Sequence, residues 1–271
     1  MKDKKPFKKK HTSAFEPPSG KKPDGKEGNP SPNGQVENDG GHPRKLNPIL
    51  AFVIAFLIVI GQFLVGEFLP GVDHTLKVSE IPPYAGEPFA VINEGQPMFR
   101  TEELVTEAYE YYSPLDELGR CGVTMACVGR EIMPTEDRES ISQVKPTGWV
   151  QNFYDFVDGE ALYNRCHLIG FQLTGENANE KNLITGTRHL NVDGMLPFEN
   201  MIADYVKETG NHVLYRVTPI YAGDDLVARG VQMEAYSVED GGEGVCFHVF
   251  CYNVQPGVII DYATGENKLA K

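Results

Sequence analysis

The run Tyr163-Asn164-Arg165-Cys166-His167-Leu168-Ile169-Gly170 places an arginine two residues before a histidine, inside a stretch of strand-like composition. Histidine changes its charge near neutral pH and often serves as a general base. Downstream, the run Asn182-Leu183-Ile184-Thr185-Gly186-Thr187-Arg188-His189-Leu190-Asn191 carries two asparagines nine residues apart. A lone histidine is more often a structural group than a catalytic one. The Arg-x-His cluster therefore indicates a site only in combination with these asparagines.

Around these two runs, the sequence predicts several short strands. Residues 89–92, 123–128 and 149–157 are apolar or aromatic and are bounded by turn residues, and the run around His167 predicts a further strand over 163–173. The last sixty residues are rich in Val, Ile, Tyr and Phe between Gly or Asp turns. They predict four more strands, at 212–220, 230–238, 244–254 and 258–262.

Two segments predict helices. Thr101 is a candidate N-cap followed by two glutamates, which predicts a helix over 101–112 that ends before Pro114. A second helix is expected over 197–208, because apolar residues recur there at i, i+3, i+4 and i+7 and Gly210 follows. The apolar positions are Phe198, Met201, Ile202 and Tyr205. Since strands and helices are segregated along the chain, the predicted class is α+β with a mostly antiparallel sheet.

The N-terminal part of the chain has a different composition. Residues 1–47 are Lys-rich and then rich in Pro, Gly, Asn and Ser, which predicts a disordered basic tail. Residues 48–69 contain the apolar run 49–65, long enough for a transmembrane signal-anchor helix, with a cleaved signal peptide as the alternative. Residues 70–88 contain several Pro and Gly and predict a stalk. Residues 89–271 are expected to form the folded domain.

The charge distribution predicts the orientation of this anchor. Residues 1–48 hold 11 Lys and Arg against 6 Asp and Glu, which leaves 14 against 32 for the rest. Because basic residues flank the apolar run only on its N-terminal side, we expect a single-pass cell-membrane protein with a cytoplasmic N-terminus and an extracellular C-terminal domain. Disulfides are permitted outside the cell, but five cysteines leave at least one thiol unpaired. Cys121 with Cys127 is one candidate pair, which the sequence does not establish.

The spacing of Asn164-Arg165-Cys166-His167 with Asn182, Asn191 and Glu199 resembles the DNA/RNA non-specific endonuclease family and its His-Me finger, or ββα-metal, site. Members of that family often carry the motif D-R-G-H. The run from Asn182 to Asn191 is most similar to Gram-positive secreted or membrane-anchored nucleases of the streptococcal DNA-entry type. The resemblance extends over roughly residues 85–271.

The resemblance implies a role for each residue of the motif. His167 matches the general base that takes a proton from the attacking water. Asn191 matches the amide ligand of one divalent cation, Mg²⁺ or alternatively Mn²⁺, and Glu199 matches an acid that holds the metal's waters. Asn182 matches an asparagine that braces the site. Arg165 matches the arginine that stabilises charge near the scissile phosphate.

Two letters of the motif depart from the family pattern. Asn164 stands where aspartate is usual, which removes a negative charge but keeps a hydrogen-bonding side chain. Cys166 stands where glycine is usual, and it would be strained if that position needed a positive φ. Both departures bear on the alignment of His167 more than on the purpose of the site.

These observations predict a metal-dependent endonuclease that hydrolyses phosphodiester bonds of DNA and RNA outside the cell. The acidic charge of residues 49–271 opposes binding of a polyanion. It motivates an alternative, a non-catalytic membrane-anchored surface protein on the same fold that binds nucleic acid or a protein. A metal ion and nearby cations would offset the acidic charge locally. The cations in or near the motif-bearing half are Arg165, Lys181, Arg188 and Arg216.

Overall fold

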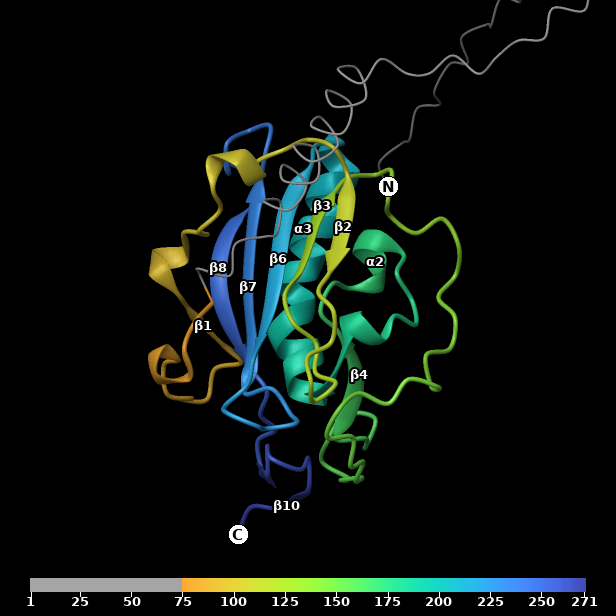
Figure 1. Ribbon diagram of the computed structural model, residues 1–271, viewed down its shortest axis with the longest axis vertical. Helices are drawn as coiled ribbons and strands as arrows, with labels where there is room; N and C mark the ends of the chain where they lie inside the picture. Colours follow the sequence, from red (N-terminus) through yellow and green to blue (C-terminus); the bar gives the residue numbers. More distant parts are fainter. Residues whose placement is uncertain (1–74) are drawn as a thin grey trace, which may run out of the picture. The chain divides into compact units, whose positions relative to one another are not determined.

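The computed structural model describes residues 75–271. Its centre is a six-stranded sheet of order β1-β8-β7-β6-β3-β2, in which all neighbouring strands are antiparallel (Figure 1). The strands are β1 (Phe89–Val91), β2 (Tyr109–Tyr112), β3 (Thr124–Val128), β6 (Val213–Ile220), β7 (Gly230–Ser237) and β8 (Cys246–Tyr252). The predicted α+β class with a mostly antiparallel sheet is confirmed for this part of the chain.

Two separate ribbons and two α-helices complete the described fold. Strands β4 (Tyr163–His167) and β5 (Leu183–Thr187) pair antiparallel, as do β9 (Val258–Ile260) and β10 (Asn267–Leu269). The helices are α2 (Phe171–Thr174) and α3 (Leu196–Thr209), and a π-helical turn (Leu190–Met195) leads directly into α3. Figure 1 shows α3 behind the central sheet, with β4 and α2 to one side of it.

The predicted tail (1–47) and transmembrane helix (48–69) lie outside the described residues. Within residues 75–271 no helix is long and apolar enough to cross a membrane. The described part of the predicted stalk lies against the sheet, because Leu76 and Ile81 pack around Phe250 and Tyr252. The Tyr252 hydroxyl also donates a hydrogen bond to the Pro82 carbonyl (2.8 Å).

Each central strand presents alternate residues to the two faces of the sheet. Along β6, Val213, Tyr215 and Val217 join the main apolar core, which also contains Ile202 and Val206 of α3. Between them, Leu214 and Arg216 point to the other face. Both faces are covered, so the strand is buried at all eight positions. This explains why its sequence is nearly continuously apolar.

Helix α3 forms where its sequence predicts it. Pro197 lies in the first turn, and Gly210 adopts φ 77° at the C-terminal cap, a conformation that glycine adopts without strain. The buried face consists of Phe198, Glu199, Ile202, Ala203 and Val206. Met201, predicted to share that face, is 46% exposed. The helix thus turns one acidic residue, Glu199, toward the interior.

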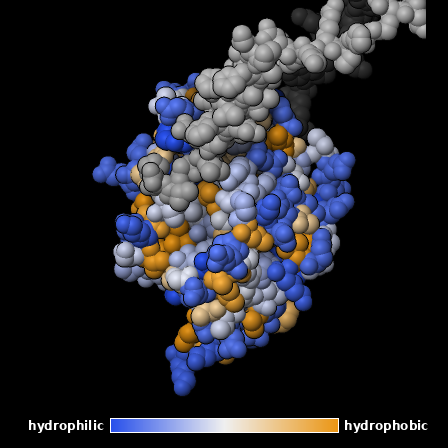
Figure 2. Space-filling model, viewed as in Figure 1, coloured by the Kyte–Doolittle hydropathy of each residue, from blue (hydrophilic) through white to orange (hydrophobic). Residues whose placement is uncertain are grey.

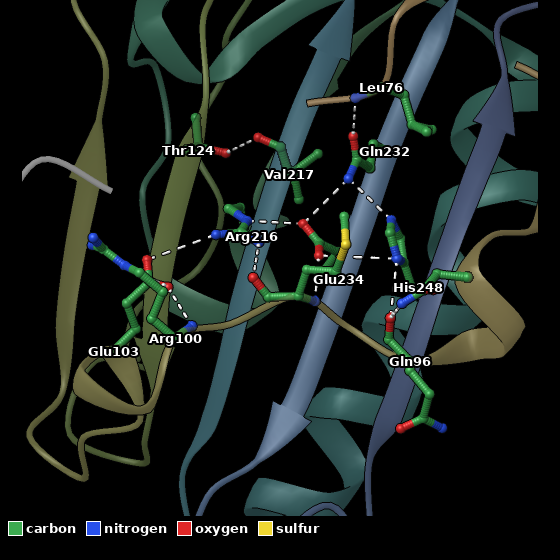
Figure 3. A network of polar contacts seen from close by, with 12 residues as sticks. Leu76, Gln96, Arg100, Glu103, Thr124, Arg216, Val217, Gln232, Glu234 and His248 are labelled. Atoms are coloured by element: carbon green, nitrogen blue, oxygen red, sulfur yellow. Dashed lines mark hydrogen bonds and ion pairs between the residues drawn. The ribbon is translucent and has the colours of Figure 1, made fainter. Parts of the chain in front are cut away.

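The face of the sheet opposite α3 carries a buried ionic network (Figure 3). Arg216, Glu234 and His248 are neighbours on β6, β7 and β8, and Arg216 Nε donates to Glu234 Oε2 at 2.8 Å. Arg216 and Glu234 are only 3% and 1% exposed. Removing one partner of such a pair would leave an uncompensated buried charge. Arg216 was expected to help offset the acidic charge near the site. It is instead a buried structural residue on the face of the sheet opposite α3.

The same network fixes the N-terminal segment 75–104 to the sheet. The backbone of Met98 donates to Glu234 Oε1 (2.8 Å) and accepts from Arg216 Nη2 (3.0 Å). The Leu76 N–H donates to Gln232 Oε1 (2.9 Å), and Glu103 Oε1 lies 3.7 Å from Arg216 Nη1. Apart from β1, which is an edge strand of the sheet, this segment therefore caps the second face.

Two sequence predictions for secondary structure are wrong, and a third is too long. The predicted helix over 101–112 is a single 3-10 turn (Thr101–Glu103) followed by strand β2, which pairs with β3. The predicted strand over 149–157 is extended only as far as Tyr154, with one isolated bridge, Phe153 to Ala161, and a turn follows at 155–157. For residues 101–112, the pairing of β2 with β3 outweighs the local helix signal, because that signal extends over only one turn. The predicted strand 163–173 ends at His167.

Candidate active site

The β4–β5 ribbon and the start of α3 bring the motif residues together. The loop between the two strands is closed by Asn182, which is fully buried. Its side chain accepts a hydrogen bond from Ile169 N and donates one to Ile169 O (both 2.9 Å). Its backbone carbonyl accepts from Leu168 N (2.9 Å). Asn182 thus holds the chain immediately after His167 in place.

The ring of His167 is held at both nitrogens. Nε2 lies 2.8 Å from the carbonyl oxygen of Asn177, and Nδ1 lies 3.3 Å from Nη2 of Arg138. Because a carbonyl oxygen only accepts hydrogen bonds, Nε2 must carry the proton. Arginine only donates, so Nδ1 must offer its lone pair. The backbone therefore selects the tautomer in which Nδ1 is the basic atom.

The surroundings of His167 keep the ring neutral. Its side chain is 6% exposed, and burial lowers its pKa to about 4, with the charge of Arg138 acting in the same direction. The hydrogen bond to the Asn177 carbonyl opposes this shift. At neutral pH the ring is thus ready to accept a proton.

Asn191 and Glu199 enter the same cleft from the π-helical turn and from the first turn of α3. The Glu199 carboxyl lies against Gly170, where an added Cβ would come within 2.7 Å of its oxygens. Burial raises the pKa of Glu199 to about 8, although the Gly170 N–H and the charge of Arg138 both act to lower it. A nearby cation would favour the ionised form.

The cleft has a volume of about 610 Å³ and is lined with cationic side chains. Arg138, Arg165 and Arg188 all line it, and Glu199 is the one acid among its lining residues, all of which lie within 75–271. The lining thus carries three arginines against one acid, whereas the domain as a whole is acidic. Local fields of this kind attract anions even to an acidic protein.

Arg165 is held by the segment that precedes β4. Its Nε donates to the Val144 carbonyl, and its Nη2 donates to the Ser142 carbonyl (2.8 Å). Its guanidinium lies over the Trp149 ring, 4.4 Å from the centroid. These contacts orient a cation at the cleft wall. Arg188 also lines the cleft and is paired with Asp158 (2.6 Å).

Sequence reasoning missed Arg138 and Asn177, which make the contacts to His167. Arg138 is 29 residues before His167 in a loop without periodic pattern, so no local signal connects them. Asn177 acts through its backbone carbonyl, which is independent of residue type.

The structure accommodates both departures in the motif. Cys166 does not have a positive φ; it is fully buried and packs on Gly186 of β5, where a Cβ would come within 2.6 Å of the Cys166 Cβ. Asn164 Oδ1 lies 3.5 Å from Arg188 Nη1, while its buried Nδ2 has no hydrogen-bond partner among the described residues. All five cysteines are free thiols, so the candidate Cys121–Cys127 disulfide is not formed.

The donor set suits a hard cation bound largely by substrate and water. Within residues 75–271 there is no cluster of three or more His, Cys, Asp or Glu that could hold a metal. The Asn191 amide makes no hydrogen bond to another described residue. A site of one amide oxygen, a nearby carboxylate and phosphate oxygens would suit Mg²⁺, which keeps several of its waters. The residues present fit such an ion.

The fold and the cleft agree with a family-level comparison of the sequence. The model of the DNA/RNA non-specific endonuclease family matches residues 101–239, more than half of the chain. The chain belongs to this family of enzymes.

Solved structures give the same result. The chain is similar to NucA from Streptococcus agalactiae with a magnesium ion bound, at 27% identity and a TM-score of 0.62, over 72% of this chain and 92% of that one. The same NucA without metal matches at 26% identity and 0.62, over 73% and 99%. Sda1 nuclease with a bound zinc ion matches at 25% and 0.55, over 68% and 97%.

Proposed function

We propose that this protein is a metal-dependent endonuclease that hydrolyses phosphodiester bonds of DNA and RNA at a ββα-metal site, with His167 as the general base. The observation that carries the proposal is the fixed tautomer of His167. The Asn177 carbonyl holds the proton on Nε2, which leaves the Nδ1 lone pair facing a cleft lined by arginines, Asn191 and Glu199. Magnesium bound to NucA and zinc bound to Sda1 support a metal-dependent reaction.

The protein's own groups perform proton transfer and charge stabilisation. Nδ1 of His167 accepts the proton of the attacking water, and the neutral ring at pH 7 makes that transfer direct. Arg138 holds Nδ1 in the free protein, and its exposed side chain can turn from the ring to a phosphate. Arg165, fixed on Trp149, supplies a cation that needs no reorganisation.

Asn191 would hold one Mg²⁺, with Mn²⁺ as an alternative, and Glu199 would accept hydrogen bonds from its waters. When bound, the ion would neutralise charge on the phosphate and on the leaving 3′ oxygen. Cleavage by this route leaves 5′-phosphate ends. Phosphate contacts carry no base information, so we expect little sequence preference and activity that falls with salt.

The activity test uses the full chain purified in detergent, with supercoiled plasmid or RNA as substrate. Cleavage should require Mg²⁺ and disappear in EDTA. His167→Ala should abolish cleavage, whereas His212→Ala, outside the cleft and paired with Glu239, should not. If metal fails to produce cleavage, or if His167→Ala cleaves like the wild type, the assignment of His167 is wrong and the non-catalytic alternative stands.

The location is part of the same proposal. We place the enzyme domain outside the cell, attached by the apolar segment 48–69, on the basis of the charge asymmetry around that segment. Protease added to intact cells should remove the C-terminal domain and leave the Lys-rich N-terminus protected. Protection of the domain would contradict this orientation.

A further inference from the structure

One wall of the cleft includes a short antiparallel ribbon formed by residues 149–154 and 160–163. Phe153 and Ala161 face each other as a bridge pair. Two backbone hydrogen bonds frame this pair, Leu162 N to Asn152 O (3.1 Å) and Tyr154 N to Glu160 O (2.8 Å). Nearer the site, the Gln151 side chain bonds to both backbone groups of Tyr163, at 2.7 and 2.9 Å. These hydrogen bonds set the register of the two segments, and the register determines which side chains point to the same face of the ribbon.

Phe153 lies on the face of the ribbon that forms the cleft. Trp149, Gln151, Ala161 and Tyr163 all line the cleft. Residues two apart on an extended chain, and residues directly opposed in an antiparallel pair, point to the same side. Phe153 satisfies both conditions, since it follows Gln151 by two residues and opposes Ala161. It therefore continues the row Trp149, Gln151, about 13 Å beyond the tryptophan.

The Phe153 ring is uncovered. It is 69% exposed, the largest exposed fraction among the large hydrophobic residues of the described chain. In the view of Figure 2, hydrophobic side chains also appear among hydrophilic ones at the end of the molecule near the C-terminus, the region to which β10 belongs. Asn152 bonds to Asn267 of β10 (2.8 Å), so the tip of the ribbon is braced while the ring stays open.

The neighbouring charges indicate what the ring would meet. Arg165 lies on Trp149, and Arg188 lines the same cleft. At the tip of the ribbon Asp158 is paired with Arg188, and Asp155 and Glu160 are exposed acids near Phe153 in the chain, so the phosphates of a strand would contact the arginines and only a base would reach the ring. Cations that follow a cleft and an exposed aromatic ring at its end are the two elements that bind a single nucleic-acid strand, through its phosphates and its bases respectively. In a duplex the bases are stacked on one another and are not offered to the ring.

We propose that Phe153 is a stacking site for an unpaired base of the substrate strand whose phosphates occupy the catalytic cleft. This inference rests on the proposed function for the location of the scissile phosphate. It gives the enzyme a preference for single-stranded or locally unpaired nucleic acid over duplex. Every base has a π face, so the preference carries no sequence specificity.

The test is a binding measurement that does not depend on cleavage. The full chain in detergent, carrying His167→Ala, is titrated against a fluorescein-labelled oligonucleotide as a single strand and as a duplex of the same sequence. Adding Phe153→Ala should weaken single-strand binding about tenfold and duplex binding less than about twofold. Phe153→Trp should retain single-strand binding, and Phe153→Leu should behave like alanine because it has no π face.

Phe156→Ala is the matched control, since Phe156 is also exposed (50%) but its ring lies beside Tyr154 and against Gly257, outside the row. It should leave both affinities unchanged. Equal loss on single strand and duplex, no loss on either, or full retention by Phe153→Leu would overturn the stacking site. Failure of the wild type to cleave any nucleic acid would refute the proposed function instead, and the binding comparison would be unaffected by it.

Discussion

Glu199 should make the metal-free protein less stable as the pH rises, and Glu199→Gln should remove that loss. The carboxyl is 8% exposed and lies against Gly170. Its pKa is raised from 4.5 to about 8 in the folded chain. Between these values the folded state holds a proton that the unfolded state has released, so stability is complete below about pH 4.5 and falls as the pH approaches 8.

The size of the effect follows from the shift. A full shift of this size corresponds to about 5 kcal/mol, at about 1.4 kcal/mol per pKa unit. Between pH 5 and pH 8 the wild type should lose about 3 kcal/mol relative to Glu199→Gln, which cannot ionise. For a domain of this length, that is a difference of roughly 6–12 °C in Tm. His167 affects both proteins equally, so it cancels in the comparison.

The assay is thermal unfolding of both proteins in EDTA across this pH range, with Glu208→Gln on the exposed side of α3 as control. Mg²⁺ should raise the Tm of the wild type at pH 8 and that of Glu199→Gln much less. The same substitution should lower nuclease activity roughly 10- to 100-fold. Parallel Tm curves for wild type and Glu199→Gln between pH 5 and pH 8 would refute the buried-acid argument.

Three further predictions concern the same site. In the Glu199→Gln background, lowering the pH from 6.5 to 4 should cost about 2–3 kcal/mol of unfolding free energy, because His167 is almost fully protonated in the unfolded state at pH 4 but only about half protonated in the folded state. Urea titrations should show that His167→Gln lacks this loss. Gly170→Ala should displace the Glu199 carboxyl and reduce activity roughly tenfold in plasmid-cleavage assays. Gly186→Ala should destabilise the protein by about 1–3 kcal/mol through contact with Cys166, and Cys166→Gly should relieve most of that loss in a double-mutant cycle. Purely additive effects of the last pair would show that the two positions do not share a contact.

The strongly patterned parts of this fold could be predicted from the sequence. Helix α3 has a helical apolar repeat between Pro197 and Gly210, and β6, β7 and β8 have long apolar runs between turns. Strand β2 could not be predicted, because its residues follow a helix N-cap signal and become a strand only by pairing with β3. Pairing between distant segments leaves no mark in a local window.

Part of the site could be predicted, because several of its residues match a family motif. His167, Asn182, Asn191 and Glu199 are identified by their resemblance to the family motif, and the structure brings three of them, all except the buried brace Asn182, to one cleft. The contacts that set the state of His167 were not predictable. Arg138 comes from an irregular loop, and the second contact is a backbone carbonyl.

The buried network under segment 75–104 determines how this domain would respond to tension. A force applied at residue 75 would load the Leu76–Gln232 hydrogen bond, then the pairing of β1 with β8, and then the contacts of Met98 with Arg216 and Glu234. The contacts of Leu76 and Met98 lie on the face of the sheet opposite α3, whereas the ribbon that carries His167 packs on the α3 side. Tension would therefore strip the N-terminal segment from the sheet before it reached the cleft. The domain could then be pulled at its N-terminal end while the cleft remained intact and bound to a long nucleic acid.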